Sequence, residues 1–171
     1  MHRSCNRSSG ILHRAWYSTK ISPTIRVATT ADIDAIVDLT YTTLRDAKML
    51  KGDRTSAFHV ASLLDKSQGG VIVAEVDNEI VGSIFVEKPD KMYALTMRKD
   101  WREQDIGSQL FRRAEVYAKQ MLGMAKVQGP VLTTRTDLFE FYERLGSIRT
   151  GIIFDHPEGG GLQAEIVMKV L

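Results

Sequence analysis

The chain has little of what would indicate a disulfide scaffold, a zinc module or a membrane protein. Its single cysteine, Cys5, cannot form an internal disulfide, and no cluster of Cys and His residues suggests a zinc site. No apolar run approaches the roughly 18 residues that a membrane-spanning helix needs. A chain of 171 residues with 43% hydrophobic content can instead build one domain with a full core. We therefore expect no structural metal and no membrane span.

Acidic residues are missing from the N-terminal stretch. The first carboxylate is Asp32, and residues 1–31 hold five basic side chains: Arg3, Arg7, Arg14, Lys20 and Arg26. Of the 23 basic residues, 18 remain for the rest of the chain, against all 21 acidic ones, which gives a formal charge of −3 there. The positive net charge thus belongs to the N-terminal stretch, and we expect no nucleic-acid partner for the folded domain.

The same stretch has the composition of a targeting peptide. Residues 1–19 are rich in Arg and Ser and contain no acid, which is typical of mitochondrial transit peptides. The sequence RAWYST, residues 14–19, resembles the processing sites of such peptides. We expect residues 1–19 to direct a domain of residues 20–171 to the mitochondrial matrix. The alternative is a disordered basic tail on a cytoplasmic protein.

A strand, a polar turn and a helix follow one another in the middle of the chain. Tyr93–Met97 alternates and is bulky enough for a half-buried strand. From Ser108 onward, apolar residues recur at helical spacing: Leu110, Phe111, Ala114, Tyr117, Ala118 and Met121. The polar turn Arg98–Gly107 joins the two elements. The stretch therefore predicts a strand that leads directly into an amphipathic helix.

Such a turn is a candidate anion site. The first N–H groups of the helix lack partners and point at the turn, and the helix dipole adds partial positive charge. Gly107 allows close approach of a bound group, and Arg98, Lys99 and Arg102 add charge nearby. The alternative is an ordinary connection, because any strand–turn–helix corner shares the first of these features.

The sequence LTMRKDWREQDIGSQL, residues 95–110, resembles the acetyl-CoA signature of the GNAT superfamily of N-acetyltransferases. The resemblance implies acetyl-CoA as co-substrate, bound by ten residues: Leu95, Thr96, Met97, Arg102, Glu103, Gln104, Asp105, Ile106, Gly107 and Ser108. In that family the strand backbone pairs with the pantetheine arm. Asp105 stands where the family usually has its first glycine. Asp tolerates positive φ better than most residues, but its charge should weaken affinity for a pyrophosphate.

A second landmark lies near the C-terminus. The sequence FYERLGS, residues 141–147, resembles the family's Phe-Tyr-Glu-Lys-x-Gly-Phe motif, with Ser147 in place of the last aromatic residue. Arg135 stands where many members have Asn. By position, Tyr142 matches the tyrosine that protonates the departing sulfur, and the Met97 N–H matches the oxyanion donor. The alternative is that the Tyr142 ring only packs in the core and has no catalytic role.

The other segments complete the predicted order of elements. Before the central stretch come a strand at 24–28, a helix capped by Thr30, a helix over 56–65, and a hairpin of strands 71–76 and 80–86 that turns at Asp77-Asn78. After it come a strand at 131–134 that follows Gly129-Pro130, a helix that begins with an Asp137/Glu140 capping box and ends at Gly146, and strands at 151–156 and 162–171. This order matches the GNAT fold. We expect an α+β domain whose mixed, mostly antiparallel sheet of about seven strands is flanked by about four helices.

The general base is not visible in the sequence. Glu87 and Glu165 could each activate an amine through water, but neither belongs to a motif, and direct proton loss to solvent is a third route. His59 is interpreted as a surface or packing residue rather than a catalyst. The role of the base therefore stays open.

Two functions are compatible with these features. The first is an N-acetyltransferase, a monomer or homodimer, that moves an acetyl group directly from acetyl-CoA to an amine of a small molecule or a protein lysine within a ternary complex. The second is a catalytically silent GNAT-fold module that binds CoA or regulates another protein. Asp105, Arg135 and Ser147 favour the second, because each departs from the family pattern.

Overall fold

The computed structural model describes residues 22–46, 56–65, 67–156 and 161–171. Within these ranges the strands are β1 (Thr24–Val27), β2 (Gly69–Val76), β3 (Glu79–Glu87), β4 (Lys91–Met97), β5 (Lys126–Leu132), β6 (Ile148–Asp155) and β7 (Gln163–Val170). The α-helices are α1 (Ile33–Asp46), α2 (Ala57–Leu64), α3 (Ile106–Gln120) and α4 (Thr136–Arg144). Two short 3-10 helices, η1 (Thr30–Asp32) and η2 (Lys99–Trp101), complete the set. The predicted α+β class is confirmed.

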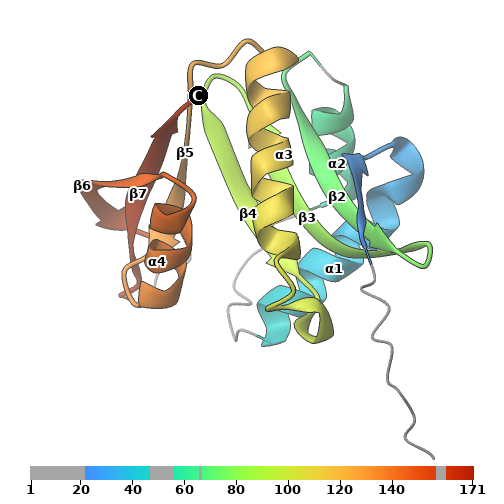
Figure 1. The fold of residues 1–171 in the computed structure, drawn as a ribbon, viewed down its shortest axis with the longest axis horizontal. Helices are drawn as coiled ribbons and strands as arrows, with labels where there is room; N and C mark the ends of the chain where they lie inside the picture. The colour runs from blue at the N-terminus through green and yellow to red at the C-terminus, as the bar shows by residue number, and fades with distance from the viewer. Residues whose placement is uncertain (1–21, 47–55, 66, 157–160) are drawn as a thin grey trace, which may run out of the picture.

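All seven strands belong to one sheet, in the order β1-β2-β3-β4-β5-β7-β6. Every pair of neighbours is antiparallel except β4 and β5, which run parallel at the centre. Figure 1 shows β4 and β5 meeting at one end and diverging towards the other, where the turn before α3 lies. The prediction of a mixed, mostly antiparallel sheet is therefore correct.

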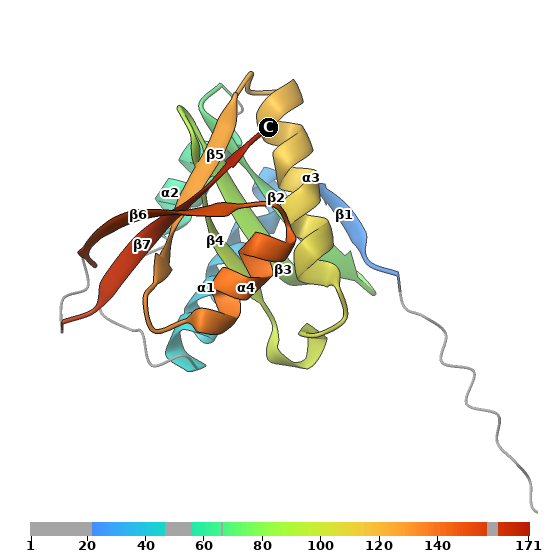
Figure 2. The same ribbon diagram turned by 60° about the vertical axis from the view of Figure 1, so that its left-hand side comes forward.

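The helices cover both faces of the sheet. Helices α3 and α4 lie on one face, and α1 and α2 on the other (Figures 1 and 2). Under α3, a large core includes the buried side chains Leu110, Ala114 and Ile84. Under α1 and α2, a second core includes Ile36, Val60 and Phe85. The strand alternation of period two supplies both cores from the same strands.

The hairpin of β2 and β3 has the predicted turn. Asp77 and Asn78 both adopt positive φ, 50° and 64°, as a two-residue hairpin loop requires. Strand β2 begins at Gly69, two residues before the predicted start at Val71. The reason is packing: a Cβ on Gly70 would meet the Tyr117 ring, whose hydroxyl donates to the Gly69 carbonyl at 2.9 Å.

The first helical segment begins one residue earlier than expected. Thr29, not Thr30, is the capping residue, and it precedes η1. The Asp32 carboxylate accepts hydrogen bonds from the Thr29 N–H at 2.7 Å and from both terminal nitrogens of Arg26 at 2.8 and 2.9 Å. This ion pair, rather than the threonine alone, fixes where the chain turns from β1 into the helix.

Part of the sequence prediction concerns residues outside the described ranges. The predicted transit peptide, residues 1–19, lies outside them. Over the described ranges, none of the helices has the length and apolar character to span a membrane. Strand β6 begins at Ile148, three residues before the predicted start.

Candidate active site

The parallel pair β4–β5 separates almost as soon as it forms. Its register contains one pair, Lys91 with Gln128. The next residue, Gly129, lies directly against the Met92 carbonyl, and Pro130 has no N–H with which to extend the ladder. Gly129-Pro130 are thus inside β5 rather than before it, which corrects the sequence expectation of a strand beginning at Val131. Beyond this point the strands diverge and leave a cleft.

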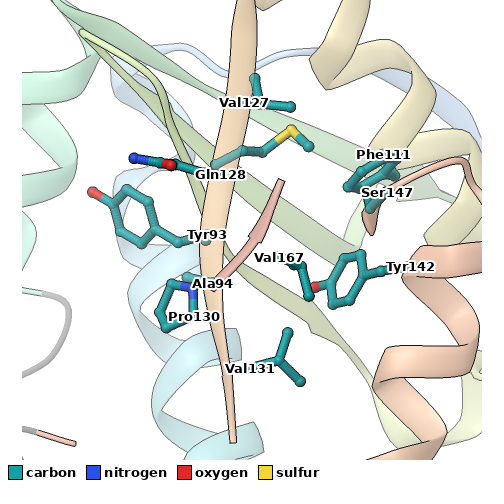
Figure 3. Close-up of a pocket in the computed structure, with 12 residues that line it drawn as sticks. Tyr93, Ala94, Phe111, Val127, Gln128, Pro130, Val131, Tyr142, Ser147 and Val167 are labelled. Atoms are coloured by element: carbon teal, nitrogen blue, oxygen red, sulfur yellow. The ribbon is translucent and has the colours of Figure 1, made fainter. Parts of the chain in front are cut away.

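The cleft is lined by residues of β4, β5, β7, α3 and α4 and by Ser147, which lies between α4 and β6. Its walls are Met92, Tyr93, Ala94, Phe111, Val127, Gln128, Gly129, Pro130, Val131, Tyr142, Ser147 and Val167. Figure 3 shows Tyr142 and Phe111 on one side of β5, and Tyr93 on the other. Side chains on both sides of β5 therefore line the cleft (Figure 3).

Strand β4 carries a bulge beside the cleft. Ala94 has φ 52°, and the β3–β4 register shifts between Ser83 and Phe85. After the bulge, the Arg98 N–H donates to the Val81 carbonyl at 2.9 Å. Because antiparallel pairing alternates, the Met97 N–H then turns away from β3 and towards the diverging gap. This geometry agrees with the expected role of the Met97 N–H as a donor to a bound group.

The helix N-terminus after the turn presents amides that the helix does not use. Helix α3 begins at Ile106, two residues before the predicted start, and its first hydrogen bond runs from the Gln109 N–H to the Asp105 carbonyl at 3.2 Å. Asp105 is the capping residue, yet its side chain makes no capping hydrogen bond with any described residue. The N–H groups of residues 106–108 therefore point at the turn, as expected for an anion site.

The turn itself reaches this shape without glycine. Glu103 and Asp105 adopt φ 65° and 61°, in the left-handed region that glycine usually occupies. The expectation that Asp105 tolerates positive φ agrees with this conformation. The side chains of residues 102–105 are exposed, so the Asp105 carboxylate is turned to solvent. Arg98 is held by Asp100 and by Glu79, the latter at 2.6 Å, which neutralises much of its charge.

The ten residues predicted to bind acetyl-CoA form one continuous corner, but their side chains point in different directions. Ile106 is buried in the core under α3, and Leu95 and Met97 pack against the same core. The Thr96 hydroxyl bonds to the Ala94 carbonyl at 2.8 Å and lies 3.3 Å from the Ser83 hydroxyl. What the corner offers to a ligand is therefore its backbone, and the assignment of cofactor contacts stays a prediction.

Tyr142 packs against neighbouring aromatic rings, and its hydroxyl also faces the cleft (Figure 3). Its ring packs on Phe111 at 5.6 Å between centroids and edge-on against Phe141 at 5.2 Å. Figure 3 shows its hydroxyl directed at the cleft beside β5. Burial raises the pKa of Tyr142 from 10.0 to about 12, against an opposing effect of the Arg135 charge. The phenol is therefore protonated at neutral pH, as a proton donor must be.

The departures from the family pattern have structural reasons. Arg135 precedes α4 and binds the Asp137 carboxylate through two hydrogen bonds of 2.8 and 2.6 Å. Asp137 is thus paired with Arg135, and the predicted capping box with Glu140 is wrong. Ser147 is buried, lines the cleft and donates its N–H to the Tyr142 carbonyl at 3.0 Å. A larger aromatic residue there would fill part of the cleft.

The two glutamates that were candidates for the base have different environments. Glu165 is buried, and it accepts hydrogen bonds from the Arg149 guanidinium and from the Gly151 N–H at 3.0 Å. The paired Arg149 lowers the pKa of Glu165, which makes it a poor base. Its role is to hold the irregular segment of β6 against β7. Glu87 instead accepts a hydrogen bond from the Tyr93 hydroxyl at 3.0 Å.

Sequence reasoning missed Tyr93 as a polar site residue. Its hydroxyl contacts both Glu87 and His59, which are six and 34 positions away along the chain. A strand tyrosine before a bulge carries no recognisable motif. His59 does pack on aromatic rings, as interpreted, but its Nε2 also lies 2.9 Å from the Tyr93 hydroxyl.

Part of the chain matches a known family model. Residues 67–146 match the model of the acetyltransferase (GNAT) domain. This segment of the chain is therefore similar to a GNAT acetyltransferase domain. The matched segment includes both motifs almost entirely, together with the hairpin before them, and the resemblance drawn from the sequence is confirmed. The acyltransferase class is likewise confirmed, and no curated protein matches the sequence.

Solved structures share the GNAT fold. Ard1 from Thermoplasma volcanium superimposes with a TM-score of 0.73 at 17% identity, covering 88% of this chain and 99% of that one. The PaiA N-acetyltransferase from Thermoplasma acidophilum, in complex with coenzyme A, gives 0.69 at 16%, with coverage of 88% and 99%. An acetyltransferase from Streptococcus agalactiae gives 0.70 at 17%, with coverage of 87% and 98%. At these identities the likeness concerns the fold.

Over the part of the chain that the structure describes, no group of three or more His, Cys, Asp or Glu residues is arranged to hold a metal ion.

Proposed function

We propose that the protein is an N-acetyltransferase that moves an acetyl group from acetyl-CoA directly to an amine of a small molecule or a protein lysine in a ternary complex. The observation that carries the proposal is the cleft between β4 and β5. At its open end lie the unused amides of α3, and in its wall lies the Tyr142 hydroxyl. A diphosphate, an extended arm and a thioester require these three features in this order.

The residues present fit acetyl-CoA. The amides of residues 106–108 would bind the pyrophosphate, and the N–H groups of β4 that face the gap would pair with the pantetheine arm. The exposed side chain of Asp105 leaves the backbone donors accessible. Acetyl-CoA supplies the thioester, and the chain supplies orientation, an oxyanion donor and a proton donor.

Acyl transfer then needs two contributions from the chain. The Met97 N–H would stabilise the oxyanion that forms when the amine attacks the thioester carbonyl. As the carbon–sulfur bond breaks, Tyr142 would give its proton to the thiolate and regain one from solvent or from the amine. The high pKa of Tyr142, about 12, keeps that proton available at neutral pH.

A catalytically silent CoA-binding module remains the alternative. The observations that favour it are the carboxylate of Asp105 at the turn and the engagement of Arg135 with Asp137. Both bear on cofactor affinity rather than on the cleft or on Tyr142. The enzyme is therefore the better explanation of a cleft that is lined from both sides of β5 and has the Tyr142 hydroxyl in its wall (Figure 3).

Two measurements separate these functions. Acetyl-CoA at 100 times its Kd should stabilise the fold by about 2.7 kcal/mol, which for a domain of this size is a rise in Tm of roughly 5–10 °C. Release of free CoA should then depend on an added amine. A melting shift without amine-dependent release would support the silent module, and no shift would contradict both functions.

We also propose that residues 1–19 direct the protein to the mitochondrial matrix. The support is their composition, rich in Arg and Ser and free of acid. Import into isolated mitochondria should shorten the chain and remove Met1. Protein that carries an intact Met1 inside the organelle would contradict cleavage, and protein that stays outside would contradict targeting.

A further inference from the structure

A hydrogen-bonded chain of three side chains lies on the sheet face opposite α3. The Tyr93 hydroxyl donates to Glu87 Oε2 at 3.0 Å and lies 2.9 Å from His59 Nε2. Tyr93 belongs to β4, Glu87 ends β3, and His59 lies in the first turn of α2. Three elements thus converge on one phenolic oxygen, which the proposed reaction has so far not used.

Packing holds the tyrosine in this position. Its ring stands edge-on to the fully buried Phe85 at 5.6 Å between centroids, and His59 lies against both rings at 6.3 and 6.4 Å. The Ser56 side chain accepts the His59 N–H and so caps the helix that carries the imidazole. The second oxygen of Glu87 faces the exposed Lys91 at 3.5 Å. The phenol is therefore placed by a rigid core, while Glu87 is half-exposed to solvent.

The geometry also fixes the proton positions. An ionised Glu87 only accepts, so the Tyr93 proton points to it. The Tyr93 oxygen must then accept from His59, which places the imidazole proton on Nε2. A hydroxyl has a second lone pair, and this one is available to a donor that approaches Tyr93. A protonated amine is such a donor.

Tyr93 lies on the side of the cleft opposite Tyr142, from which an acceptor amine would approach. It and the bulged Ala94 line the cleft on β4, whereas Tyr142 lines it from α4. Figure 3 shows the two tyrosines on opposite sides of β5, with the Tyr93 hydroxyl directed away from Tyr142. A thioester held on the α3 side would thus meet an amine that arrives from the α2 side.

We propose that Tyr93 and Glu87 form the relay that takes the proton from the acceptor amine, and that His59 positions the Tyr93 hydroxyl. This inference rests on the proposed acetyl transfer. The ammonium gives one proton to the Tyr93 oxygen while the Tyr93 proton moves to Glu87, and the neutral amine then attacks the thioester. Glu87 passes its proton to solvent. Tyr93 is neutral before and after, so it transmits a proton without ionising.

The relay indicates a class of acceptor. A carboxylate that takes a proton through a phenol is required only when the acceptor amine binds as an ammonium ion. Such an acceptor is a strongly basic primary amine, for example an alkylamine or a lysine side chain. A weakly basic amine, already neutral at assay pH, gains little from it. The relay therefore distinguishes acceptors by their basicity.

The experiment compares two acceptors of similar shape whose amines differ in basicity. A primary alkylamine that the wild-type enzyme acetylates is paired with its aminooxy analogue, in which oxygen replaces the carbon next to nitrogen and the amine is neutral at pH 7. Tyr93→Phe and Glu87→Gln should lower kcat/KM for the alkylamine by roughly 100-fold, a typical contribution of general base catalysis. For the aminooxy analogue the loss should stay within about threefold.

Controls separate catalysis from folding. Glu140→Gln, at an exposed position of α4, should leave both rates unchanged. His59→Gln keeps an N–H donor and should retain most activity with the alkylamine, whereas His59→Ala should not. Acetyl-CoA should raise the Tm of Tyr93→Phe and Glu87→Gln as it does for the wild type, because neither side chain belongs to the backbone corner proposed to bind the cofactor.

The outcomes are distinct. Equal losses of Tyr93→Phe with both acceptors, or no loss with either, would overturn the relay while leaving acetyl transfer intact. A wild-type enzyme that acetylates none of the amines would overturn the proposed function and the relay with it. Selective loss with the alkylamine in both variants supports the relay.

Discussion

The backbone of Gly129 in β5 lies directly against the carbonyl of Met92 in β4, with no space for a side chain between them. This contact is where the parallel strands last touch before they separate. Gly129→Ala would force a Cβ into a backbone carbonyl that cannot move without shifting β4. We expect a loss of about 1–3 kcal/mol in the free energy of unfolding, measured by denaturant titration.

Gly107→Ala is the matched control for that substitution. A Cβ at Gly107 would stand 3.7 Å from the Phe141 ring, an ordinary contact, and Gly107 lies inside a helix. Its stability should be unchanged or higher by up to about 1 kcal/mol. Equal stability of the two alanine variants would contradict the close approach of β4 and β5.

Asp105 limits the affinity for acetyl-CoA in this account. Its carboxylate stands at the N-terminus of α3, beside the amides that would bind the pyrophosphate. Asp105→Asn removes the charge while keeping a residue that tolerates positive φ, and should lower the Kd by roughly fivefold or more, equivalent to about 1 kcal/mol. Calorimetry at low and high salt checks this result. An unchanged Kd at low salt would show that the carboxylate does not meet the ligand.

Tyr142→Phe tests the proton donor. The variant keeps the ring that packs on Phe111 and loses only the hydroxyl, so its stability should change little. We expect kcat to fall by about 10²–10⁴, with the Kd for acetyl-CoA unchanged. Because the pKa of Tyr142 is raised to about 12, activity of the wild type should not decline below pH 10 through loss of this proton. A variant with normal kcat would reduce Tyr142 to a packing residue.

Asp32 should make stability depend on pH in the acid range. The hydrogen bonds from Arg26, opposed by burial, lower the pKa of Asp32 from 3.8 to about 2. The carboxylate therefore stabilises the folded state fully above about pH 4, and this stabilisation is lost as the pH falls towards 2. We expect it to contribute about 2 kcal/mol at pH 7.

Asp32→Asn provides the measurement for that effect. The variant should be less stable than the wild type at pH 7, and the difference should shrink by about 2 kcal/mol as the pH falls to 2. A difference that is constant over this range would show that the charge of Asp32 does not stabilise the folded state.

Much of the fold could be predicted because its signals are local. The hairpin at Asp77-Asn78 depends on two adjacent residues with positive φ, and the α3 stripe depends on spacing within a single helix. Gly129-Pro130 misled the prediction for a physical reason. These residues usually interrupt strands, but here the glycine admits a neighbouring strand and the proline marks where pairing with it stops.

The relay could not be predicted, because no local pattern connects its members. His59, Glu87 and Tyr93 come from three elements, and the sheet brings them together only after β3 and β4 have paired. The bulge at Ala94 then shifts which β4 residues face each side of the sheet. Glu87 appeared in the sequence as one of two equivalent carboxylates, and only the structure shows that Glu165 is locked by Arg149.

The most direct test of the central claim follows the acetyl group itself. Purified protein is incubated with acetyl-CoA carrying an isotopically labelled acetyl group and with a panel of primary alkylamines and a lysine peptide, and the products are identified by mass spectrometry. The account predicts that the label appears on the nitrogen of at least one acceptor, with one free CoA released per product. Absence of labelled product from every acceptor, under conditions where acetyl-CoA binds, would contradict it.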